Sequence, residues 1–340
     1  MSEPILPMPD VPPGLVASVP DTPDVPDIIE LLAAHQMAAH GSSSVDPGMV
    51  ASNVAGAGSW TRRQALVRDA DGTATAWVVV HDRAAGRTVV EISARPEVTD
   101  DLAAKLFAWA SEEARTMMRV RGLTVTQLDS GAYAGDGRQQ RWLTAAGYGL
   151  ARTWLQMSRP VTADDADLPA PREGVTVRPI RLHDDGTPVA IDLQAVHLVL
   201  EQSFADHFNS YRESFPEFVQ RLREDPGHRW KHWWLAEVES DGVLLPGGAV
   251  VGTVLPPDAS GAPGSYIDYI GVHRRSRGRG VAKALLRTVI GDALQTGSNR
   301  VGLEVDADSP TGADGLYTSM GWVTSYKTES WHRDLSLTAD

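Results

Sequence analysis

An internal repeat divides this chain of 340 residues into two halves. A segment centred on Ile92 is matched by one centred on Ile270, 178 positions later. Near the ends of the halves, the run that contains Gly147 resembles the run that contains Gly321, 174 positions later. Both matches occur in the same order, and a repeat this long is a duplicated domain rather than a solenoid unit. The sequence therefore predicts two copies of one domain.

The two halves also share an order of predicted elements. Each opens with helical segments, and each continues with two strands around an Asp-Gly turn, followed by a strand, an amphipathic helix, a strand, a helix and a closing strand. The clearest segments are helices over 25–37, 188–204 and 215–223, and strands over 64–68, 75–81, 233–238 and 249–254. This alternation predicts an α+β fold in which each domain is a twisted mixed sheet flanked by helices.

Two shifts in composition predict the domain boundaries. Residues 1–20 are rich in proline and predict an extended N-terminal arm. Residues 161–173 combine aspartates and prolines with little periodicity, as an interdomain linker does. We therefore expect an N-terminal domain over 21–160 and a C-terminal domain over 174–340.

Composition excludes several classes of function. A net charge of −13 argues against a general nucleic-acid binder. The absence of cysteine excludes disulfides, thiolate metal sites and a cysteine nucleophile. No apolar run approaches the roughly 20 residues of a membrane-spanning helix, and the first residues lack the pattern of a secretion signal. We expect a cytoplasmic protein that binds neither membranes nor nucleic acid.

One basic cluster stands out in this acidic chain and predicts a pocket for an anionic ligand. Its members are Arg274, Arg275, Arg277, Arg279, Lys283 and Arg287. The strand-like run 266–272 leads into this cluster, and an apolar-periodic helix follows from Val281. Gly278 and Gly280 allow close backbone approach, while the helix N-terminus and the arginines favour phosphate oxygens. A solvated basic turn is the alternative, which the place between a strand and a helix disfavours.

The spacing of this loop differs from a P-loop and from a dinucleotide-binding fingerprint, because it lacks their glycine patterns. The run Arg275-Ser276-Arg277-Gly278-Arg279-Gly280 instead resembles the Arg/Gln-x-x-Gly-x-Gly/Ala coenzyme A motif of the GNAT superfamily. The strand 300–305 and the run 315–322, with its Leu-Tyr-x-x-x-Gly-Trp pattern, are similar to the family's next strand and helix. The resemblance covers roughly residues 174–335 and extends to the first half in outline. It is closest to tandem actinobacterial GNAT proteins, a group that includes mycothiol synthase.

The resemblance implies an N-acetyltransferase. The donor would be acetyl-coenzyme A, the acceptor a primary amine of a small molecule, and the transfer direct within a ternary complex, without a metal. It places the backbone N–H of Val272 against the carbonyl oxygen of the acetyl group. The residues implied in coenzyme binding are Ile270, Gly271, Val272, Arg275, Arg277, Gly278, Arg279, Gly280, Val281, Ala282 and Ser309.

Two side chains are candidates for proton transfer. Tyr317 occupies the place of the family's tyrosine near the coenzyme A sulfur and would protonate the departing thiolate; a packed core tyrosine is the alternative. Many family members carry a glutamate on the strand where this chain has Tyr266. Asp268 lies on the same face by strand alternation, so we expect it to act as general base or amine anchor, or as a structural hydrogen-bonding group.

The N-terminal copy lacks these features. Under the 178-residue separation, the run Glu97–Leu102 stands in place of the arginine and glycine loop and carries three acids and no glycine. Leu143 stands in place of Tyr317 under the 174-residue separation. We expect this copy to be catalytically dead toward acetyl-coenzyme A.

Other functions compete with this interpretation. Within enzymes, mycothiol synthase shares the tandem architecture; outside them stand a non-catalytic acyl-coenzyme A sensor or interaction protein and an RNA-associated factor. Tyr317 argues against a sensor, and the net charge argues against RNA.

His228 and His232 could place two imidazoles on one helix face for a metal, but the neighbouring tryptophans favour aromatic packing. The run 204–208 could line the acceptor pocket or cap a helix. We expect a monomer, as a pseudo-dimer of domains, or a homodimer.

Overall fold

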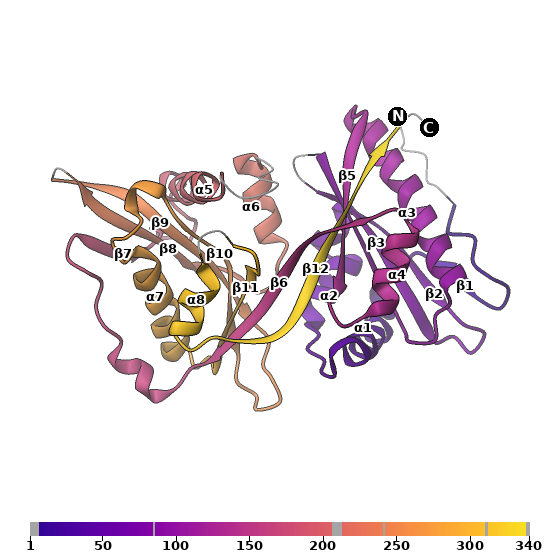
Figure 1. Cartoon of the computed structure of the whole chain (residues 1–340), viewed down its shortest axis with the longest axis horizontal. Coiled ribbons are helices and arrows are strands. Elements are labelled where there is room, and N and C mark those ends of the chain that lie inside the picture. The colour runs from indigo at the N-terminus through magenta and orange to yellow at the C-terminus, as the bar shows by residue number, and fades with distance from the viewer. Residues whose placement is uncertain (1–6, 84–85, 206–212, 241, 310–311, 338–340) are drawn as a thin grey trace. The chain divides into compact units, whose positions relative to one another are not determined.

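The computed structural model describes residues 7–83, 86–205, 213–240, 242–309 and 312–337 (Figure 1). Within these residues the chain forms two compact units. The first unit comprises residues up to Leu155 together with 306–308 and the chain from Tyr326 onward. The second unit comprises the remaining residues, from Gln156 to Val305 and from Ser309 to Ser325. Helices and strands mix within each unit, which confirms the predicted α+β class.

The elements follow the same order in the two units. The first unit contains β1 (Val16–Ser18), α1 (Val25–His40), α2 (Pro47–Ala55), β2 (Arg62–Arg68), β3 (Ala74–Arg83), β4 (Arg87–Ala94), α3 (Asp100–Arg121), β5 (Val125–Tyr133) and α4 (Gly137–Ala145). The second contains β7 (Val175–Pro179), α5 (Ala190–Phe204), α6 (Phe215–Arg223), β8 (His228–Ser240), β9 (Val243–Leu255), β10 (Gly264–Val272), α7 (Val281–Gln295), β11 (Arg300–Asp306) and α8 (Ala313–Ser319). The strands β6 (Gly149–Pro160) and β12 (Val323–Ser336) follow α4 and α8.

The strand pairing repeats as well. β2, β3 and β4 pair antiparallel in sequence, and β4 then pairs in parallel with β5. β8, β9 and β10 pair antiparallel, and β10 then pairs in parallel with β11. A helix connects each parallel pair, as a parallel connection requires. The common order confirms that the two units repeat one mixed strand topology.

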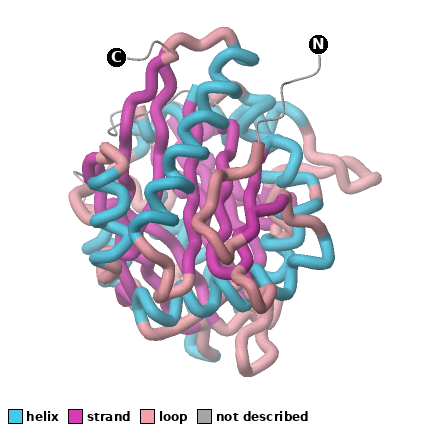
Figure 2. The backbone as a smooth tube through the Cα atoms, turned by 90° about the vertical axis from the view of Figure 1, so that its right-hand side faces the viewer, coloured by secondary structure: helices cyan, strands magenta, loops and turns pink. Residues whose placement is uncertain are grey.

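Helices cover both faces of each sheet. In the first unit α3 lies over the strands, as Figure 2 shows, and its apolar side forms the larger core together with Trp142 of α4. α1 and α2 close the opposite face around Trp77. In the second unit a β-carbon on Gly271 would meet Ser203 of α5, whereas one on Gly248 would meet Val281 of α7. α5 and α7 therefore pack on opposite faces of β9 and β10.

The limits of α3 illustrate why these segments form helices. The Thr99 side chain accepts the Leu102 N–H at 3.3 Å at the first turn. Gly122 ends the helix in a left-handed conformation with φ of 68°. Between these caps, residues three and four apart face the sheet and are buried. The helices and strands predicted in the sequence are all present, although His228 and His232 lie on strand β8 and not on a helix, which corrects that expectation.

The two units differ from the predicted boundaries of the domains. The domain expected over 174–340 excludes the chain from Tyr326, because β12 pairs antiparallel with β5 from Thr328 to Ser336. The last strand of the chain thus completes the sheet of the first unit. The expected arm 1–20 is also packed where it is described, since β1 pairs with β2. Composition could not reveal either pairing.

The expected linker 161–173 belongs to the second unit and contains a short 3-10 helix, Ala163–Asp167, that packs against α7. Among the residues that the structure describes, no helix is long and apolar enough to cross a membrane.

Candidate active site

β10 and β11 run side by side over only part of their length. They pair in parallel from Ser265–Val301 to Ile267–Leu303, whereas β10 stays paired with β9 as far as Val272. The two parallel strands therefore part after Ile267. Among the described residues, one edge of β10 from 268 to 272 has no strand partner.

The direction of the backbone groups along this open edge follows from one hydrogen bond. The N–H of His273 donates to the carbonyl of Gly247 at 3.0 Å. This bond continues the ladder between β10 and β9. Because backbone groups alternate along a strand, the N–H groups of Val272 and Ile270 point away from β9, into the open side. They can pair with an extended ligand as a neighbouring strand would, or with a single carbonyl oxygen.

The loop after β10 leads to the N-terminus of α7, which begins after two glycines. Gly278 and Gly280 have φ of 77° and 84°, a left-handed conformation that disfavours side chains. The first bond within α7 runs from the Ala284 N–H to the Gly280 carbonyl at 3.0 Å. The N–H groups of Val281 and the two residues after it therefore have no acceptor within the helix. With the helix dipole, they form a place for phosphate oxygens.

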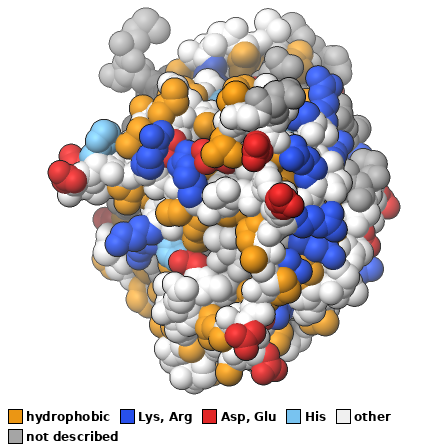
Figure 3. All heavy atoms as spheres, turned by 90° about the vertical axis from the view of Figure 1, so that its left-hand side faces the viewer, with side chains coloured by type: hydrophobic (Ala, Val, Ile, Leu, Met, Phe, Trp, Pro, Cys, Tyr) orange, Lys and Arg blue, Asp and Glu red, His pale blue; other side chains and the backbone are white. Residues whose placement is uncertain are grey.

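The arginines of this loop differ in their surroundings. Arg279 donates to the Glu239 carbonyl at 2.9 Å, and Arg275 donates to the Pro246 carbonyl at 3.3 Å. Arg277 is exposed to solvent. Figure 3 shows several groups of lysine and arginine side chains on the face of the second unit that it views. The loop thus combines Arg275 and Arg279, which backbone carbonyls hold, with Arg277, and both Arg275 and Arg277 are exposed to solvent.

Arg172 adds a cation that sequence reasoning missed. Its Nη1 donates to the Gly278 carbonyl at 3.3 Å, and its Cδ lies 2.9 Å from the position of a β-carbon on Gly280. The residue belongs to the expected linker 161–173, whose composition favoured an unstructured connection. The one signal for it was an arginine within an otherwise acidic stretch.

Tyr317 lies on α8 and is almost fully buried, with 7% of its surface exposed. Its ring meets that of Trp322 edge to face at a centroid distance of 6.0 Å. Burial raises the pKa of Tyr317 to about 12, so its hydroxyl stays protonated at neutral pH. The residue can therefore act as a hydrogen-bond donor, and it packs like a core side chain at the same time.

Asp268 is the extra residue of a β-bulge in β10. The register against β9 shifts between Ile267 and Tyr269, so Asp268 has no partner there. Its Oδ2 is buried without a hydrogen-bond partner. Burial raises the pKa of Asp268 to about 7, the charge of Asp225 acts in the same direction, and Arg221 and the Thr253 hydroxyl oppose them. The carboxyl is thus poised to exchange a proton near neutral pH.

Asp268 faces the α5 and α6 side of the sheet, where Arg221 and the Thr253 hydroxyl interact with it. Tyr269 lies on the same side because the bulge interrupts the alternation, and the Arg221 guanidinium stands over its ring at 5.3 Å. Arg221 is held in turn by both carboxylate oxygens of Glu213, at 2.8 and 2.7 Å. The run 204–208, considered above for the acceptor pocket, lies outside the described residues from 206 onward.

Other residues predicted to bind coenzyme A also take part in packing or in turns of the chain. Gly271 is the point where α5 packs most closely on β10, since its β-carbon would lie 2.9 Å from Ser203. The Val281 side chain is in the core, so only its backbone is available to a ligand, and Ala282 is half-buried. Ser309 precedes α8, and its carbonyl accepts the Gly312 N–H at 3.1 Å.

The first unit has a similar parting of strands with different contents. β4 and β5 pair only as far as Val90–Ser130. Beyond that point, Nδ1 of the buried His35 lies 3.0 Å from both the nitrogen and the oxygen of Ala94. Whichever nitrogen carries the proton, the imidazole occupies the backbone edge at Ala94, the counterpart of Val272 under the 178-residue separation.

The start of α3 is likewise occupied by side chains of its own unit. Thr99 caps the Leu102 N–H, and the Asp100 carboxylate accepts the indole N–H of Trp142 at 2.6 Å. The first turn therefore carries negative charge already. No group of three or more metal-ligating side chains is found in the described part of the chain.

Comparison with protein families matches the Acetyltransferase (GNAT) family to residues 201–322. The matched region contains the bulge of β10, the glycine and arginine loop, α7 and α8. No curated protein matches the chain significantly.

Solved structures match nearly the whole chain. A GCN5-related N-acetyltransferase from Sphaerobacter thermophilus is 25% identical, with a TM-score of 0.73 over 97% of this chain and 98% of that one. A tandem GNAT protein from the clavulanic acid biosynthesis pathway is 15% identical, with a TM-score of 0.64 over 96% and 100%. The GNAT region of a fungal multi-domain GH3 β-N-acetylglucosaminidase is 10% identical, with a TM-score of 0.61 over 95% and 38%. These likenesses show that the chain has the fold of two tandem GNAT domains.

Proposed function

Because residues 201–322 match the GNAT acetyltransferase family, we propose that the second unit transfers an acetyl group from acetyl-coenzyme A to a primary amine of a small molecule. The observation that carries the proposal is the parting of β10 from β11, directly followed by the anion-binding loop. An extended arm that ends in a pyrophosphate has the shape and charge for these two features together.

The residues present fit coenzyme A in two ways. The open edge of β10 offers the N–H groups of Ile270 and Val272 to the amides of the pantetheine arm and to the thioester. The loop offers the helix N-terminus, the left-handed Gly278 and Gly280, and nearby guanidinium groups to the pyrophosphate. We assign Arg172 to this set as well.

The transfer needs no covalent enzyme intermediate, and the chain has no cysteine to form one. The amine nitrogen attacks the thioester carbon while its proton passes to the Asp268 carboxylate. The negative charge that develops on the carbonyl oxygen is held by the Val272 N–H. The carbon–sulfur bond then breaks, and the Tyr317 hydroxyl donates to the departing thiolate. The products are an amide and free coenzyme A.

The pKa values of the two side chains agree with these roles. An Asp268 pKa of about 7 lets the carboxylate accept a proton near neutral pH. Tyr317, with its pKa raised to about 12, is protonated before the reaction. A coenzyme A thiol with an ordinary pKa of about 8.5 is a stronger acid than Tyr317, so its thiolate would take little of the Tyr317 proton in water. A dry site also raises the pKa of the thiolate beside the tyrosine, which brings the two groups closer.

The surroundings of Asp268 favour a cationic acceptor. Asp268 and Asp225 interact electrostatically on this face of the sheet, and the nearby Arg221 is already paired with Glu213. An ammonium group entering here meets the carboxyl groups of Asp268 and Asp225, whose negative charge attracts the amine. An anionic acceptor would meet the same charge as repulsion.

The test is a panel of primary amines incubated with acetyl-coenzyme A, with release of free thiol followed by a thiol reagent. The panel includes diamines, amino sugars, arylalkylamines and a cysteinyl pseudodisaccharide, so that the acceptor of mycothiol synthase is among the outcomes. We expect at least one small amine to be acetylated, with identity of the amide confirmed by mass spectrometry.

Two outcomes would contradict the proposal. Failure to bind acetyl-coenzyme A at all would remove the cofactor assignment. Tight binding with no turnover on any amine would favour an acyl-coenzyme A sensor, because such a protein needs the loop and not the proton-transfer groups.

A further inference from the structure

The first unit contains a cavity of about 190 Å³ on the side of its sheet that α1 and α2 cover. Its walls come from α1, the turn before α2, α2 itself and the strands β3 and β4. The cavity is smaller than the roughly 300–1,000 Å³ of pockets for drug-sized ligands, yet it is much larger than the space of one water molecule. Its size suits a ligand of a few heavy atoms.

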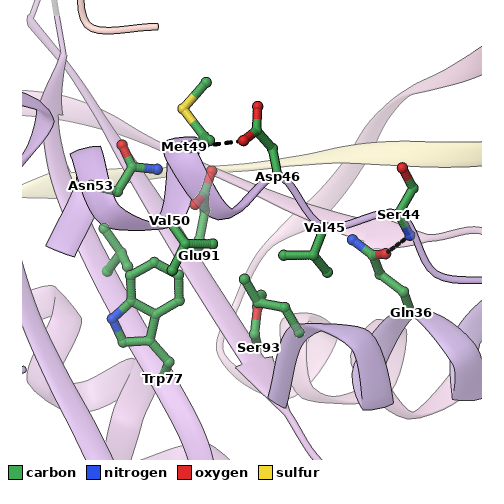
Figure 4. Close-up of a pocket in the computed structure, with 12 residues that line it drawn as sticks. Gln36, Ser44, Val45, Asp46, Met49, Val50, Asn53, Trp77, Glu91 and Ser93 are labelled. Atoms are coloured by element: carbon green, nitrogen blue, oxygen red, sulfur yellow. Dashed lines mark hydrogen bonds between the residues drawn. The ribbon is translucent and has the colours of Figure 1, made fainter. Parts of the chain in front are cut away.

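The lining of the cavity is mixed, with apolar side chains, four neutral polar residues (Gln36, Ser44, Asn53 and Ser93) and negative charge at two places. Trp77, Met49 and Val50 supply an aromatic and aliphatic wall, as Figure 4 shows. Glu91 from β4 and Asp46 from the start of α2 supply the carboxylates. No lysine or arginine is among the twelve residues that line this cavity. The charged groups of the lining therefore repel an anion and attract a cation.

The two carboxylates are not neutralised by a basic side chain in their surroundings. One oxygen of Asp46 caps α2 by accepting the N–H groups of Gly48 and Met49 at 2.8 and 3.2 Å. Among the described residues, the second oxygen of Asp46 has no hydrogen-bond partner. Glu91 is exposed toward the cavity side of β4, and no ion pair with Glu91 occurs in the described part of the chain. A bound cation could form ion pairs with both carboxylates.

The position of Glu91 links this cavity to the internal repeat. Glu91 pairs with Val79 of β3, as Tyr269 pairs with Val251 of β9 in the second unit. β4 pairs with β3 without the shift that marks Asp268 in β10. Glu91 is thus the first residue of β4 beyond its parting from β5, and it faces the helices that correspond to α5 and α6. The first unit keeps a carboxylate on its acceptor-like side although its coenzyme side is filled.

We propose that the first unit binds a small organic ammonium ion in this cavity, between the carboxylates of Glu91 and Asp46 and against the indole of Trp77. The ligand is a primary ammonium carried on a short apolar chain. Its charge pairs with the two carboxylates, its chain packs on Met49 and Val50, and the indole face favours a cation. The site binds without transferring an acyl group, so it would hold a ligand apart from the reaction.

The experiment uses the full chain without coenzyme A and two probes of equal size, n-butylammonium and 1-butanol. Binding is followed by NMR of ¹³C-labelled methionine methyl groups, with the Met49 signal assigned through Met49→Leu. We expect the ammonium to shift the Met49 signal in a saturable way at millimolar concentration, and the alcohol to bind about tenfold more weakly or not at all.

Variants at the carboxylates test the source of the affinity. Asp46→Asn removes a charge and keeps a residue that caps helices well. We expect Asp46→Asn and Glu91→Gln each to weaken n-butylammonium binding about threefold to fivefold, as partly exposed charge pairs do, and the double variant by about tenfold or more. Glu30→Gln, an exposed glutamate on α1 outside the cavity, serves as the matched control and should leave the affinity unchanged.

Three results would overturn the proposal. The Met49 signal could remain still at every probe concentration, the alcohol could bind as well as the ammonium, or the double variant could bind as the original chain does. A shift confined to Met320 of the second unit would also count against it. Because no coenzyme A is present, the result stands apart from the success or failure of the acetyltransferase proposal.

Discussion

The two units share one topology and differ at the edge where their parallel strands part. In the second unit the backbone at Val272 faces an open side. In the first unit the same edge at Ala94 is met by His35, and Arg138 donates to the Ala94 carbonyl at 3.2 Å. A buried backbone group needs a partner, and the first unit supplies one from its own side chains. The difference shows that the same edge is filled by side chains in one unit and left without a strand partner in the other, where we propose that a ligand binds.

The helix after this strand, α7 in the second unit and α3 in the first, also differs between the two units. α7 begins after glycines in left-handed conformation and among guanidinium groups, whereas α3 begins with the Thr99 cap and two aspartates. Both helix starts have the same dipole, but only one of them is free to act on an external anion. Likewise, Leu143 is buried in the first unit where Tyr317 stands in the second. Three features thus separate the two units.

The largest effect is expected at Tyr317. Tyr317→Phe keeps the ring and its packing on Trp322 and removes the hydroxyl that donates to the thiolate. We expect turnover to fall by about 10²–10⁴, with acetyl-coenzyme A affinity almost unchanged, because the interaction is used in the transition state. Steady-state kinetics and calorimetric binding measure the two quantities.

The first unit offers a matched control for that variant. Tyr148 is also buried, and burial raises its pKa to about 12 as well. Tyr148→Phe should leave turnover unchanged apart from any loss of stability. Equal loss of turnover in the two variants would show that packing, and not proton donation, explains the effect, and Tyr317 would then be a core residue.

Asp268 tests whether the bulge carries a base. We expect the turnover of the original chain to rise with pH through about 7, as the carboxyl ionises. Asp268→Asn should lower turnover by about 10²–10⁴ and abolish that rise. A pH–rate profile for the same amine with both proteins makes the comparison. A variant that keeps the profile would assign the ionisation to another group.

The same variant has an expected effect on stability that a structural role would not produce. The folded pKa of Asp268 lies above the unfolded value of about 3.9. Its favourable contribution is therefore complete below about pH 4 and is lost as pH rises through about 7. At about 1.4 kcal/mol for each unit by which a pKa moves, the ionised carboxylate costs up to about 4 kcal/mol above pH 7. Relative to the original chain, Asp268→Asn should gain stability between pH 5 and pH 8, measured by denaturant unfolding.

Arg172 tests whether the cation missed in the sequence belongs to the coenzyme site. We expect Arg172→Ala to weaken acetyl-coenzyme A binding about tenfold, because a charge-assisted bond to phosphate contributes about 1.5–3 kcal/mol. Substitution of Gly280 would not isolate this effect, since any side chain there is strained at φ of 84°. Arg141→Ala on α4, an exposed arginine of the first unit, is the control and should bind as the original chain does.

Much of the fold was accessible from the sequence because it follows from local patterns. Alternation and helical periodicity placed the strands and helices, and the repeat predicted one topology in two copies. The loop from Arg275 to Gly280 was recognisable because its glycines and arginines are adjacent in sequence. The prediction that Asp268 faces the same side as Tyr266 rests on period-two counting, which cannot detect the bulge at Asp268.

The remaining features depend on contacts between distant residues. The pairing of β12 with β5 joins segments about 200 positions apart, and nothing in either strand names its partner. The approach of Arg172 to Gly278 depends on how the segment before β7 packs along α7. His35 contacts Ala94 across 59 positions in the sequence. The sequence therefore indicated a change in the first unit only through the acids and the absence of glycine in the run Glu97–Leu102.

The smallest effect on coenzyme binding is expected from His35→Ala, which opens the edge at Ala94. The original chain should bind one acetyl-coenzyme A, and the variant should also bind one, because the start of α3 keeps Thr99 and its acids and still repels a pyrophosphate. The variant should lose about 1–3 kcal/mol of stability, since a buried backbone group at Ala94 loses a partner. Native mass spectrometry counts the bound coenzyme, and unfolding in denaturant measures the stability. A second equivalent of acetyl-coenzyme A would mean that the imidazole alone closes the first unit, and that the acids at the start of α3 are tolerated by the ligand.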